Sequence, residues 1–191
     1  MRTNPERRRA LVDAAIEVLA RDGARGLTFR AVDVAASVPV GTASNYFSNR
    51  DDLLTQAGGR IYERLLPDDA TMAQSRSGTQ DRAKYAELMH ELVERITAFN
   101  TGFLALLELR LEATRRPALR SVLTERVRQD MEVNVAYHAA SGLPGDADAV
   151  IMLYMALNWL IVDRLTLPDL LTPERSRELV SILVERLVPE G

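Results

Sequence analysis

The sequence has no cysteine and only two histidines, His90 and His138, among its 191 residues. Without thiols the chain can form neither a disulfide framework nor a thiolate metal site. The two histidines are far apart in the sequence and do not supply the closely spaced ligands of a multi-histidine zinc site. We therefore predict that the protein holds no metal and no cofactor.

The motifs of common enzyme classes are also missing. The sequence has no glycine-rich phosphate loop, no Gly-x-Ser-x-Gly nucleophile elbow and no cysteine nucleophile. His90 is followed by Glu91 and Glu94, but not by the second histidine of a zinc-binding helix. These absences predict that the protein is not an enzyme.

No apolar segment of the sequence is as long as a membrane-spanning helix. The most apolar segment, residues 151–162, has twelve residues, whereas a helix needs about 20 to cross a bilayer. The first six residues carry charge but no apolar stretch follows them, which argues against a secretion signal. We expect a cytoplasmic protein.

Charge is unevenly distributed along the chain. Hydrophobic residues make up 47% and charged residues 27% of the sequence, as in an ordinary soluble globular protein. The net charge is −3, yet residues 1–50 contain eight arginines and five acidic residues, a net charge of +3 that leaves −6 for the rest. A basic head on an acidic body favours a DNA contact, although a solvated basic face has the same composition.

A helical hydrophobic period runs through almost the whole chain, and neither an alternating strand pattern nor an internal repeat is present. Glycine and proline residues such as Gly23 and Pro117 interrupt this helical period. We predict an all-α fold. About nine helices are expected, at residues 5–22, 29–37, 41–47, 51–65, 81–98, 101–115, 118–140, 147–166 and 173–188.

The expected helices fall into two parts. Residues 67–80 are polar and read as a loop that separates these parts. We expect a helix-turn-helix DNA-binding head at 1–50 and a connecting helix at 51–65. A helical ligand-sensing and dimerisation body is expected at 66–191.

A helix-turn-helix is expected near the N-terminus, with its second helix at 29–37, a turn at 38–40 and a recognition helix at 41–47. The recognition helix is small-sided, so its backbone can approach base edges, and its hydroxyl and amide groups can hydrogen-bond them. Flanking groups can hold phosphates. The candidate DNA-binding residues are Thr28, Arg30, Gly41, Thr42, Ser44, Asn45, Tyr46 and Arg50. Alternatively, Thr28 is no more than a helix cap and Arg50 is simply solvated.

Several residues in the segment 7–56 form a multi-part pattern. They are the pair Ala14–Ala15, Gly23, Thr28, the pairs Val34–Ala35, Gly41–Thr42 and Tyr46–Phe47, and then Arg50 and Leu53. In this pattern the segment resembles the DNA-binding domain of the TetR family of transcriptional regulators. The family usually has tyrosine at the position of Ser44, glycine at Ser37 and lysine at Arg50. We expect a weaker phosphate contact from Ser44, whereas the other two changes look tolerable.

The resemblance also implies a homodimer, and the apolar C-terminal helices agree with it. Residues 150–162 are apolar on nearly every side, with Asn158 as the only strongly polar member. Such a helix must be buried on every side, so one side can face the body core and another a second subunit. The predicted dimer residues are Leu153, Leu157, Ile161, Leu179, Leu183 and Leu187. A large internal core in a monomer is the alternative.

The resemblance further implies a small-molecule effector bound in the body. Apolar walls with a few polar anchors are the usual composition of such a site, although they are also typical of ordinary core. The candidate ligand-binding residues are Phe99, Phe103, Leu107, Arg110, Tyr137, Met155, Asn158 and Trp159. Arg110 could anchor an anionic group, pair with Glu108 or Glu112, or extend into solvent.

Together these features predict a ligand-responsive transcriptional regulator, and more specifically a repressor. As a homodimer it would read a pseudo-palindromic operator in double-stranded DNA, and a largely apolar effector would release it. Ligand and DNA would then weaken each other's binding equally. The rival interpretation is a helical module whose head binds a protein. A protein-binding helix should carry large apolar anchors, whereas residues 41–47 are mostly small and polar.

Overall fold

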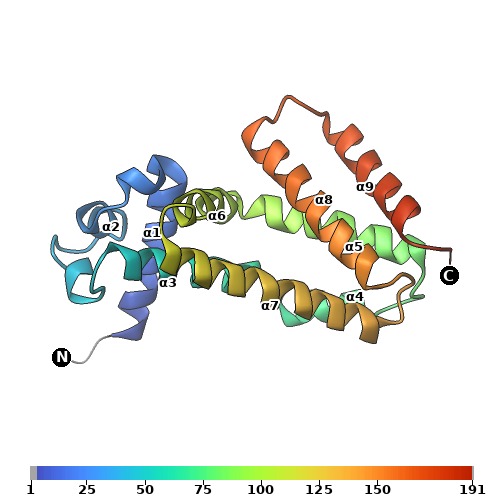
Figure 1. The fold of residues 1–191 in the computed structure, drawn as a ribbon, viewed down its shortest axis with the longest axis horizontal. Coiled ribbons are helices and arrows are strands. Elements are labelled where there is room, and N and C mark those ends of the chain that lie inside the picture. The colour runs from blue at the N-terminus through green and yellow to red at the C-terminus, as the bar shows by residue number, and fades with distance from the viewer. Residues whose placement is uncertain (1–3, 191) are drawn as a thin grey trace. The chain divides into compact units, whose positions relative to one another are not determined.

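The structure, a computed structural model, describes residues 4–190 and contains helices but no strand in that range (Figure 1). This confirms the predicted all-α fold. The helices are α1 (Pro5–Gly26), α2 (Phe29–Ala35), the 3-10 helix η1 (Ala43–Asn45), α3 (Arg50–Leu65), α4 (Asp69–Ser75), α5 (Arg82–Ala98), α6 (Asn100–Ala113), α7 (Pro117–Ser141), α8 (Ala147–Thr166) and α9 (Pro173–Leu187).

The described residues form two compact units. The head unit comprises residues 4–66 and 99–126, and the body unit comprises residues 67–98 and 127–190. α6 and the first part of α7 therefore pack with the N-terminal helices, although they come late in the sequence. The functional division at residue 66 that the sequence suggested remains a prediction.

The predicted helix boundaries hold for the long helices and fail in two short segments. α8 begins and ends where the helix at 147–166 was expected. Residues 41–47, expected to be a helix, contain only the single turn η1, and the loop expected at 67–80 contains α4. Asp68 explains α4, because its side chain accepts a hydrogen bond from the Thr71 N–H (2.8 Å) and caps the helix.

α1 changes direction at Gly23, the position where the sequence predicted a break. Gly23 has φ 69°, a left-handed backbone conformation that side chains with a Cβ rarely adopt. A Cβ at this position would also lie 3.2 Å from Oε2 of Glu108 on α6. Glycine thus allows both the bend and the close approach of α6.

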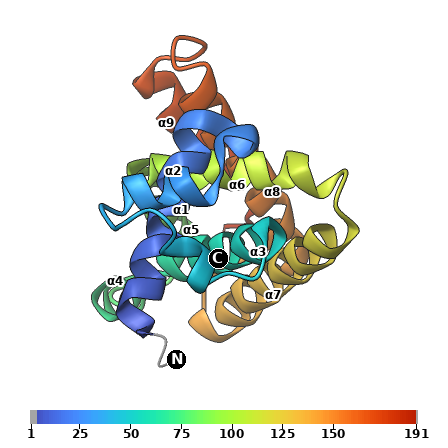
Figure 2. The ribbon, with the colours of Figure 1, turned by 90° about the vertical axis from the view of Figure 1, so that its left-hand side faces the viewer.

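The head unit has a dense leucine-rich core, around which α1, α2 and α3 are arranged (Figure 2). Its fully buried large side chains are Leu11, Ile16, Leu19, Leu27, Leu53, Leu54, Ile61 and Leu109. Burying each such side chain contributes about 1.5–3 kcal/mol to folding. α6 packs extensively along α1, and Thr101 Oγ1 donates a hydrogen bond to Glu17 Oε1 between them (3.0 Å). The helix-turn-helix therefore packs on a core that α6 helps to bury.

In the body unit, α5, α8 and α9 pack against one another (Figure 1). Leu153, Leu157 and Ile161 of α8 are each 1% exposed. These predicted dimer residues lie four residues apart on one helix face, and the chain itself buries that face. Their contact with a second subunit stays a prediction. Leu153, for example, shares a core cluster with Tyr85 of α5 and Val184 of α9.

α8 is longer than the apolar run counted in the sequence. It has 20 residues and is apolar enough, by length and composition, to cross a membrane. A core helix of a globular protein meets the same criterion, and α8 packs on α5 and α9. Only 28% of its most apolar stretch is buried within the chain, so the helix leaves apolar surface uncovered.

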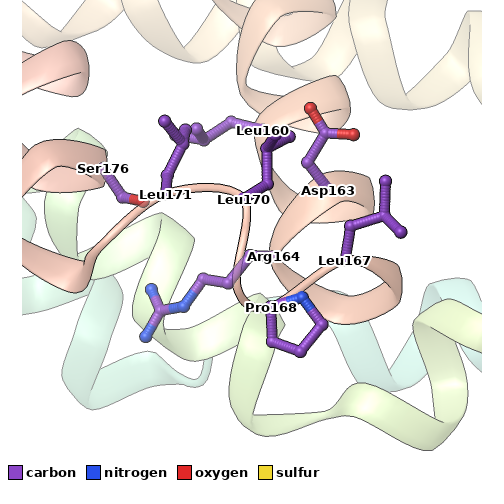
Figure 3. A pocket seen from close by; sticks show the side chains of 8 residues that line it. All are labelled: Leu160, Asp163, Arg164, Leu167, Pro168, Leu170, Leu171 and Ser176. Carbon is purple, nitrogen blue, oxygen red and sulfur yellow. The ribbon is translucent and has the colours of Figure 1, made fainter.

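A small hollow lies at the turn between α8 and α9 (Figure 3). The side chains that line it are Leu160, Asp163, Arg164, Leu167, Pro168, Leu170, Leu171 and Ser176. Its volume of about 10 Å³ is room for roughly one water molecule. The hollow is too small to hold an effector.

Candidate nucleic-acid interface

α2 begins with the cap that the sequence predicted. Thr28 Oγ1 accepts a hydrogen bond from the Ala31 N–H (3.1 Å), which satisfies one of the free amides of the first turn. Arg30, in the same turn, is exposed. Its guanidinium is accessible to a phosphate, and the DNA contact of both residues remains a prediction.

A buried carboxylate joins α2 to the turn that follows it. Asp33 has no exposed surface, and its two oxygens accept hydrogen bonds from the backbone N–H groups of Gly41 and Ala43, each at 2.7 Å. Charge-assisted bonds of this length fix η1 relative to α2. Asp33 is not among the residues predicted from the sequence. The available signal was an acidic residue in a short helix just before a tight turn, whose amides need an acceptor.

The turn between α2 and η1 passes through two left-handed residues. Gly41 has φ 93°, and a Cβ there would meet no other atom, so the need for glycine is conformational. Ser37 has φ 53° without being glycine. The Ser37 replacement, expected to be tolerable, therefore places a strained residue where the family often has glycine.

The polar side chains expected to contact bases donate hydrogen bonds to backbone carbonyl groups within the turn. Thr42 Oγ1 donates to the Pro39 carbonyl (2.5 Å), while Ser44 Oγ (2.8 Å) and Asn45 Nδ2 (3.0 Å) both donate to the Gly41 carbonyl. Ser44 and Asn45 are nevertheless exposed. A hydroxyl that donates can still accept, and the Asn45 carboxamide retains its oxygen for another partner.

The same bonds explain why residues 41–47 do not form the expected α-helix. Threonine, serine and asparagine side chains compete with the backbone for hydrogen bonds and favour turns over helix interiors. Gly41 lies outside helical geometry. The Phe47 N–H still donates to the Ala43 carbonyl (3.0 Å), so one helix-like turn survives.

η1 is held to the head core from its C-terminal side. Phe47 is 2% exposed, and Tyr46 packs half-buried against the same core. The guanidinium of Arg8 from α1 lies 5.3 Å from the centre of the Phe47 ring. The DNA contact predicted for the Tyr46 hydroxyl remains a prediction.

Arg50 does not extend freely toward solvent. It is the first residue of α3, its Nε donates to the Leu27 carbonyl (3.1 Å), and its Nη2 donates to the Ala24 carbonyl. The guanidinium therefore holds carbonyl groups at the end of α1. The phosphate contact expected from the sequence remains a prediction, and it would have to share a group that this internal role already occupies.

Acidic residues of α6 extend the network around Arg50. Oε2 of Glu108 accepts a hydrogen bond from the Ala24 N–H (3.0 Å). Glu112, one helical turn later, accepts from Arg116 Nε (2.9 Å), and Arg116 also contacts Asp51 of α3. The hydrogen bond from Arg116 lowers the pKa of Glu112, with a contribution from the charge of Arg50, although burial acts in the opposite direction. These contacts connect α6 to both ends of the helix-turn-helix.

The predicted ligand residues divide between the two units. Those in the head unit are Phe99, Phe103, Leu107 and Arg110, and those in the body unit are Tyr137, Met155, Asn158 and Trp159. None of them lines the hollow of Figure 3. Phe103 is buried, the Arg64 guanidinium lies 3.9 Å from the centre of the Phe99 ring, and Arg110 extends into solvent.

The uncovered apolar surface of α8 is concentrated on one face. Met152, Met155 and Trp159 are 47%, 61% and 68% exposed, and their spacing places them together on the helix surface. Two of these residues were expected in a ligand site, but in this chain they point outward. On α9, Leu179 and Leu183 are half-buried and so keep some accessible apolar surface.

Two family models match the chain. The model described as "Bacterial regulatory proteins, tetR family" matches residues 11–57, and the model described as "Tetracyclin repressor-like, C-terminal domain" matches residues 80–190. The first match covers the helix-turn-helix and the second covers α5 to α9. Both halves of the chain thus point to the same family.

Curated relatives are similar over part of their length. The HTH-type transcriptional repressor KstR of Mycolicibacterium smegmatis is 38% identical over 60 residues, which are 31% of this chain and 29% of that protein. The HTH-type nicotine-responsive transcriptional repressor HdnoR of Paenarthrobacter nicotinovorans is 26% identical over 113 residues, 59% of this chain and 57% of that protein. The chain thus matches less than two thirds of each of these relatives.

Solved structures match over nearly the whole chain. A TetR-family member from Streptomyces coelicolor A3, SCO1917, is 30% identical with a TM-score of 0.67 and covers 97% of this chain and 99% of its own. The multidrug binding protein EbrR, in complex with ethidium, is 30% identical with a TM-score of 0.66, covering 95% and 99%. A regulator from Rhodococcus sp. Rha1, 21% identical with a TM-score of 0.75 and covering 97% and 96%, shares the fold.

Proposed function

Because this chain belongs to the TetR family of bacterial transcriptional regulators, we propose that it is a repressor that binds operator DNA through the turn at residues 41–46. The observation that carries the proposal is the pair of hydrogen bonds from the Gly41 and Ala43 amides to the buried carboxylate of Asp33, called the Asp33 clamp below. The clamp fixes an exposed, polar turn to α2. In this motif the first residues of the second helix contact base edges. As a DNA-binding regulator it would work in the cytoplasm.

We assign base reading to Thr42, Ser44 and Asn45. Their hydroxyl and carboxamide groups can exchange a bond within the turn for one to a base, or accept from a base while still donating to the turn. Arg30 and Tyr46 are assigned to the phosphate backbone, which positions the protein without reading sequence.

The proposed repressor acts as a homodimer. Its subunit face is formed by the exposed residues Met152, Met155 and Trp159 of α8, with Leu179 and Leu183 of α9 at its edge. An exposed apolar face of this kind on a soluble protein is typical of an interaction surface. A two-fold pair would present two turns to the two half-sites of a pseudo-palindromic operator.

A small-molecule effector is proposed to release the DNA. The related EbrR has been solved with imidazole, ethidium and proflavin, which supports a small aromatic effector for this chain. α6 is suited to transmit binding, because Glu108 holds the Ala24 N–H beside the bend of α1. An effector that shifts α6 would move the helix-turn-helix, and by linkage DNA would weaken effector binding equally.

The proposal can be tested by selecting bound duplexes from a random pool and measuring their affinity by fluorescence anisotropy. We expect a two-fold symmetric site whose binding weakens steeply with salt. Thr42→Ala and Asn45→Ala should change the preferred bases, each with a loss of about tenfold on the original site. Arg30→Ala should weaken all sequences alike. Asn134→Ala, an exposed asparagine of α7, is the matched control.

Two results would contradict the proposal. The first is the absence of DNA binding at low ionic strength. The second is an unchanged base preference in both the Thr42 and Asn45 variants, which would move base reading to another surface.

A further inference from the structure

Val40 lies at the corner of the turn that leads into η1. The Thr42 N–H donates a hydrogen bond to the Pro39 carbonyl (3.1 Å), which closes a β-turn over residues 39–42. Gly41 has φ 93°, as at the third position of a type II turn. Val40 therefore occupies the second position, and its side chain is 68% exposed. The core of the head unit does not account for this apolar side chain.

Turn geometry does not call for a valine at this position either. Glycine, proline, asparagine, aspartate and serine dominate turns, whereas valine is enriched in strands. The backbone on both sides of Val40 is nevertheless held in place. Asp33 Oδ2 accepts a hydrogen bond from the Gly41 N–H (2.7 Å), and Thr42 Oγ1 donates to the Pro39 carbonyl (2.5 Å). The β-branched side chain is stiff, so a contact made by Val40 costs little conformational entropy.

Basic side chains are missing from the sequence around this turn. Residues 31–49, between Arg30 and Arg50, contain no arginine, lysine or histidine. Arginine and lysine make the commonest specific contact with guanine, whereas asparagine pairs with adenine and apolar groups contact the methyl group of thymine. The exposed side chains of the turn include Asn45 and Val40. The turn is therefore better matched to A·T pairs than to G·C pairs.

We propose that Val40 reads the C5-methyl group of a thymine in the major groove and so selects an A·T pair in each half-site of the operator. Cytosine has no methyl group at this ring position. Its amino group would lose water beside a valine without gaining a hydrogen bond. The inference rests on the proposed function, because it names the base pair that the same turn recognises.

The test uses the full chain and the duplex selected from the random pool. Each half-site thymine is replaced in turn, in both half-sites, by deoxyuridine, which keeps the base pairing and lacks the methyl group. At one position the unmodified chain should lose about fourfold in affinity for each methyl group, or roughly 15-fold for the two half-sites. Val40→Ala should bind the thymine duplex as weakly as the unmodified chain binds the uracil duplex, and it should not distinguish the two duplexes.

Val34→Ala is the matched control. Val34 is also an exposed valine of the helix-turn-helix (65% exposed), but it belongs to α2. The first helix of this motif crosses the DNA backbone and does not enter the groove. Val34→Ala should therefore keep the full preference for thymine over uracil. Because both valines are exposed, circular dichroism should show that both variants fold like the unmodified chain.

Three results would overturn the inference while the repressor remains. The first is equal affinity of the unmodified chain for the thymine and uracil duplexes at every half-site position. The second is a preference for thymine that persists in Val40→Ala, which would assign the effect to DNA shape or to another side chain. The third is a selected half-site without a thymine. If the chain binds no duplex at low ionic strength, the proposed function fails, and the reading of thymine fails with it.

Discussion

At the residue scale, Asp33 determines whether the candidate DNA-reading turn is held in place. Replacing it by alanine would leave the amides of Gly41 and Ala43 without their acceptor. Ala43 is buried and an unsatisfied buried amide costs about 1–3 kcal/mol, whereas the amide of the exposed Gly41 can bond to water, so Asp33→Ala should lower the free energy of unfolding by about 1–3 kcal/mol. Urea unfolding followed by circular dichroism measures this loss. The exposed Asp22 offers the control, and Asp22→Ala should change stability by less than about 0.5 kcal/mol.

DNA binding gives a second readout for the same variant. At temperatures where Asp33→Ala is still folded, its operator affinity should fall, because the turn has lost its attachment to α2. A variant with normal stability and normal affinity would show that the Asp33 carboxylate does not organise the turn.

Ser37 offers the opposite experiment, a substitution that should stabilise the protein. A left-handed residue with a Cβ costs about 1–2 kcal/mol, and Ser37 has φ 53°. Ser37→Gly removes this strain but adds about 0.5–1 kcal/mol of unfolded-chain entropy, so we expect a net gain of up to about 1 kcal/mol. Thermal unfolding should show a raised midpoint for Ser37→Gly and a lowered one for the β-branched Ser37→Val. A lower unfolding midpoint for Ser37→Gly would show that the backbone of Ser37 is not strained.

The sequence predicted some of these residue roles and could not predict others. The cap at Thr28 and the break at Gly23 follow from residue type and local spacing, so they were expected and observed. The Asp33 clamp depends on where the chain returns after a turn. The Arg50 contacts join residues 23 and 26 positions apart, which no local pattern specifies.

At the element scale, the long helices were predictable and the short ones were not. α7, α8 and α9 are long segments without strand alternation whose ends lie at or beside glycine or proline residues, which indicates their type and approximate bounds. The segment 41–47 is too short for a period to decide its structure, and its side-chain bonds favour a turn. α4 lies in a polar stretch, where one aspartate cap outweighs composition.

α6 packs with helices that come much earlier in the sequence. It was expected in the body, yet it packs along α1. Nothing in its periodicity distinguishes the two positions, because an apolar helix face fits any apolar surface of suitable shape. Its acidic residues Glu108 and Glu112 specify the partner, since they meet a free backbone amide and a cluster of arginines.

Arg50 connects these elements, and its replacement separates a structural role from a DNA contact. Arg50→Ala leaves the carbonyls of Ala24 and Leu27 without their charged donor and should lower the free energy of unfolding by about 2 kcal/mol. The salt dependence of its DNA affinity should not change. Arg30→Ala should do the reverse, with normal stability and a salt slope reduced by about one. A reduced salt slope of DNA binding in the Arg50 variant would support the phosphate contact expected from the sequence.

At the scale of the whole molecule, the surface of α8 is the feature that most requires a partner. The sequence correctly indicated a helix apolar on every side, but could not tell which side the chain would bury itself. The answer depends on tertiary packing: the face of Leu157 fills the core, and the face of Trp159 stays exposed. The prediction of a dimer through the C-terminal helices therefore remains, with a different set of α8 residues.

Trp159→Glu tests this assignment. A carboxylate in the middle of an apolar interface would be desolvated without a partner, so the variant should be monomeric at concentrations where the unmodified chain is a dimer. Because Trp159 is 68% exposed, its replacement should leave the folding of a single chain nearly unchanged. Sedimentation equilibrium measures the association, and circular dichroism measures the folding.

The DNA affinity of this variant should separate the dimer from the reading turn. On an operator with two half-sites, Trp159→Glu should lose at least about tenfold in affinity, because the second turn no longer binds as part of the same molecule. On a single half-site its affinity should match that of the unmodified chain. Val133→Glu, on α7, removes an equally accessible apolar side chain (61% exposed) and should leave both association and affinity intact. If Trp159→Glu remains a dimer while Val133→Glu dissociates, the subunit face lies on α7 and the exposed side of α8 has another partner.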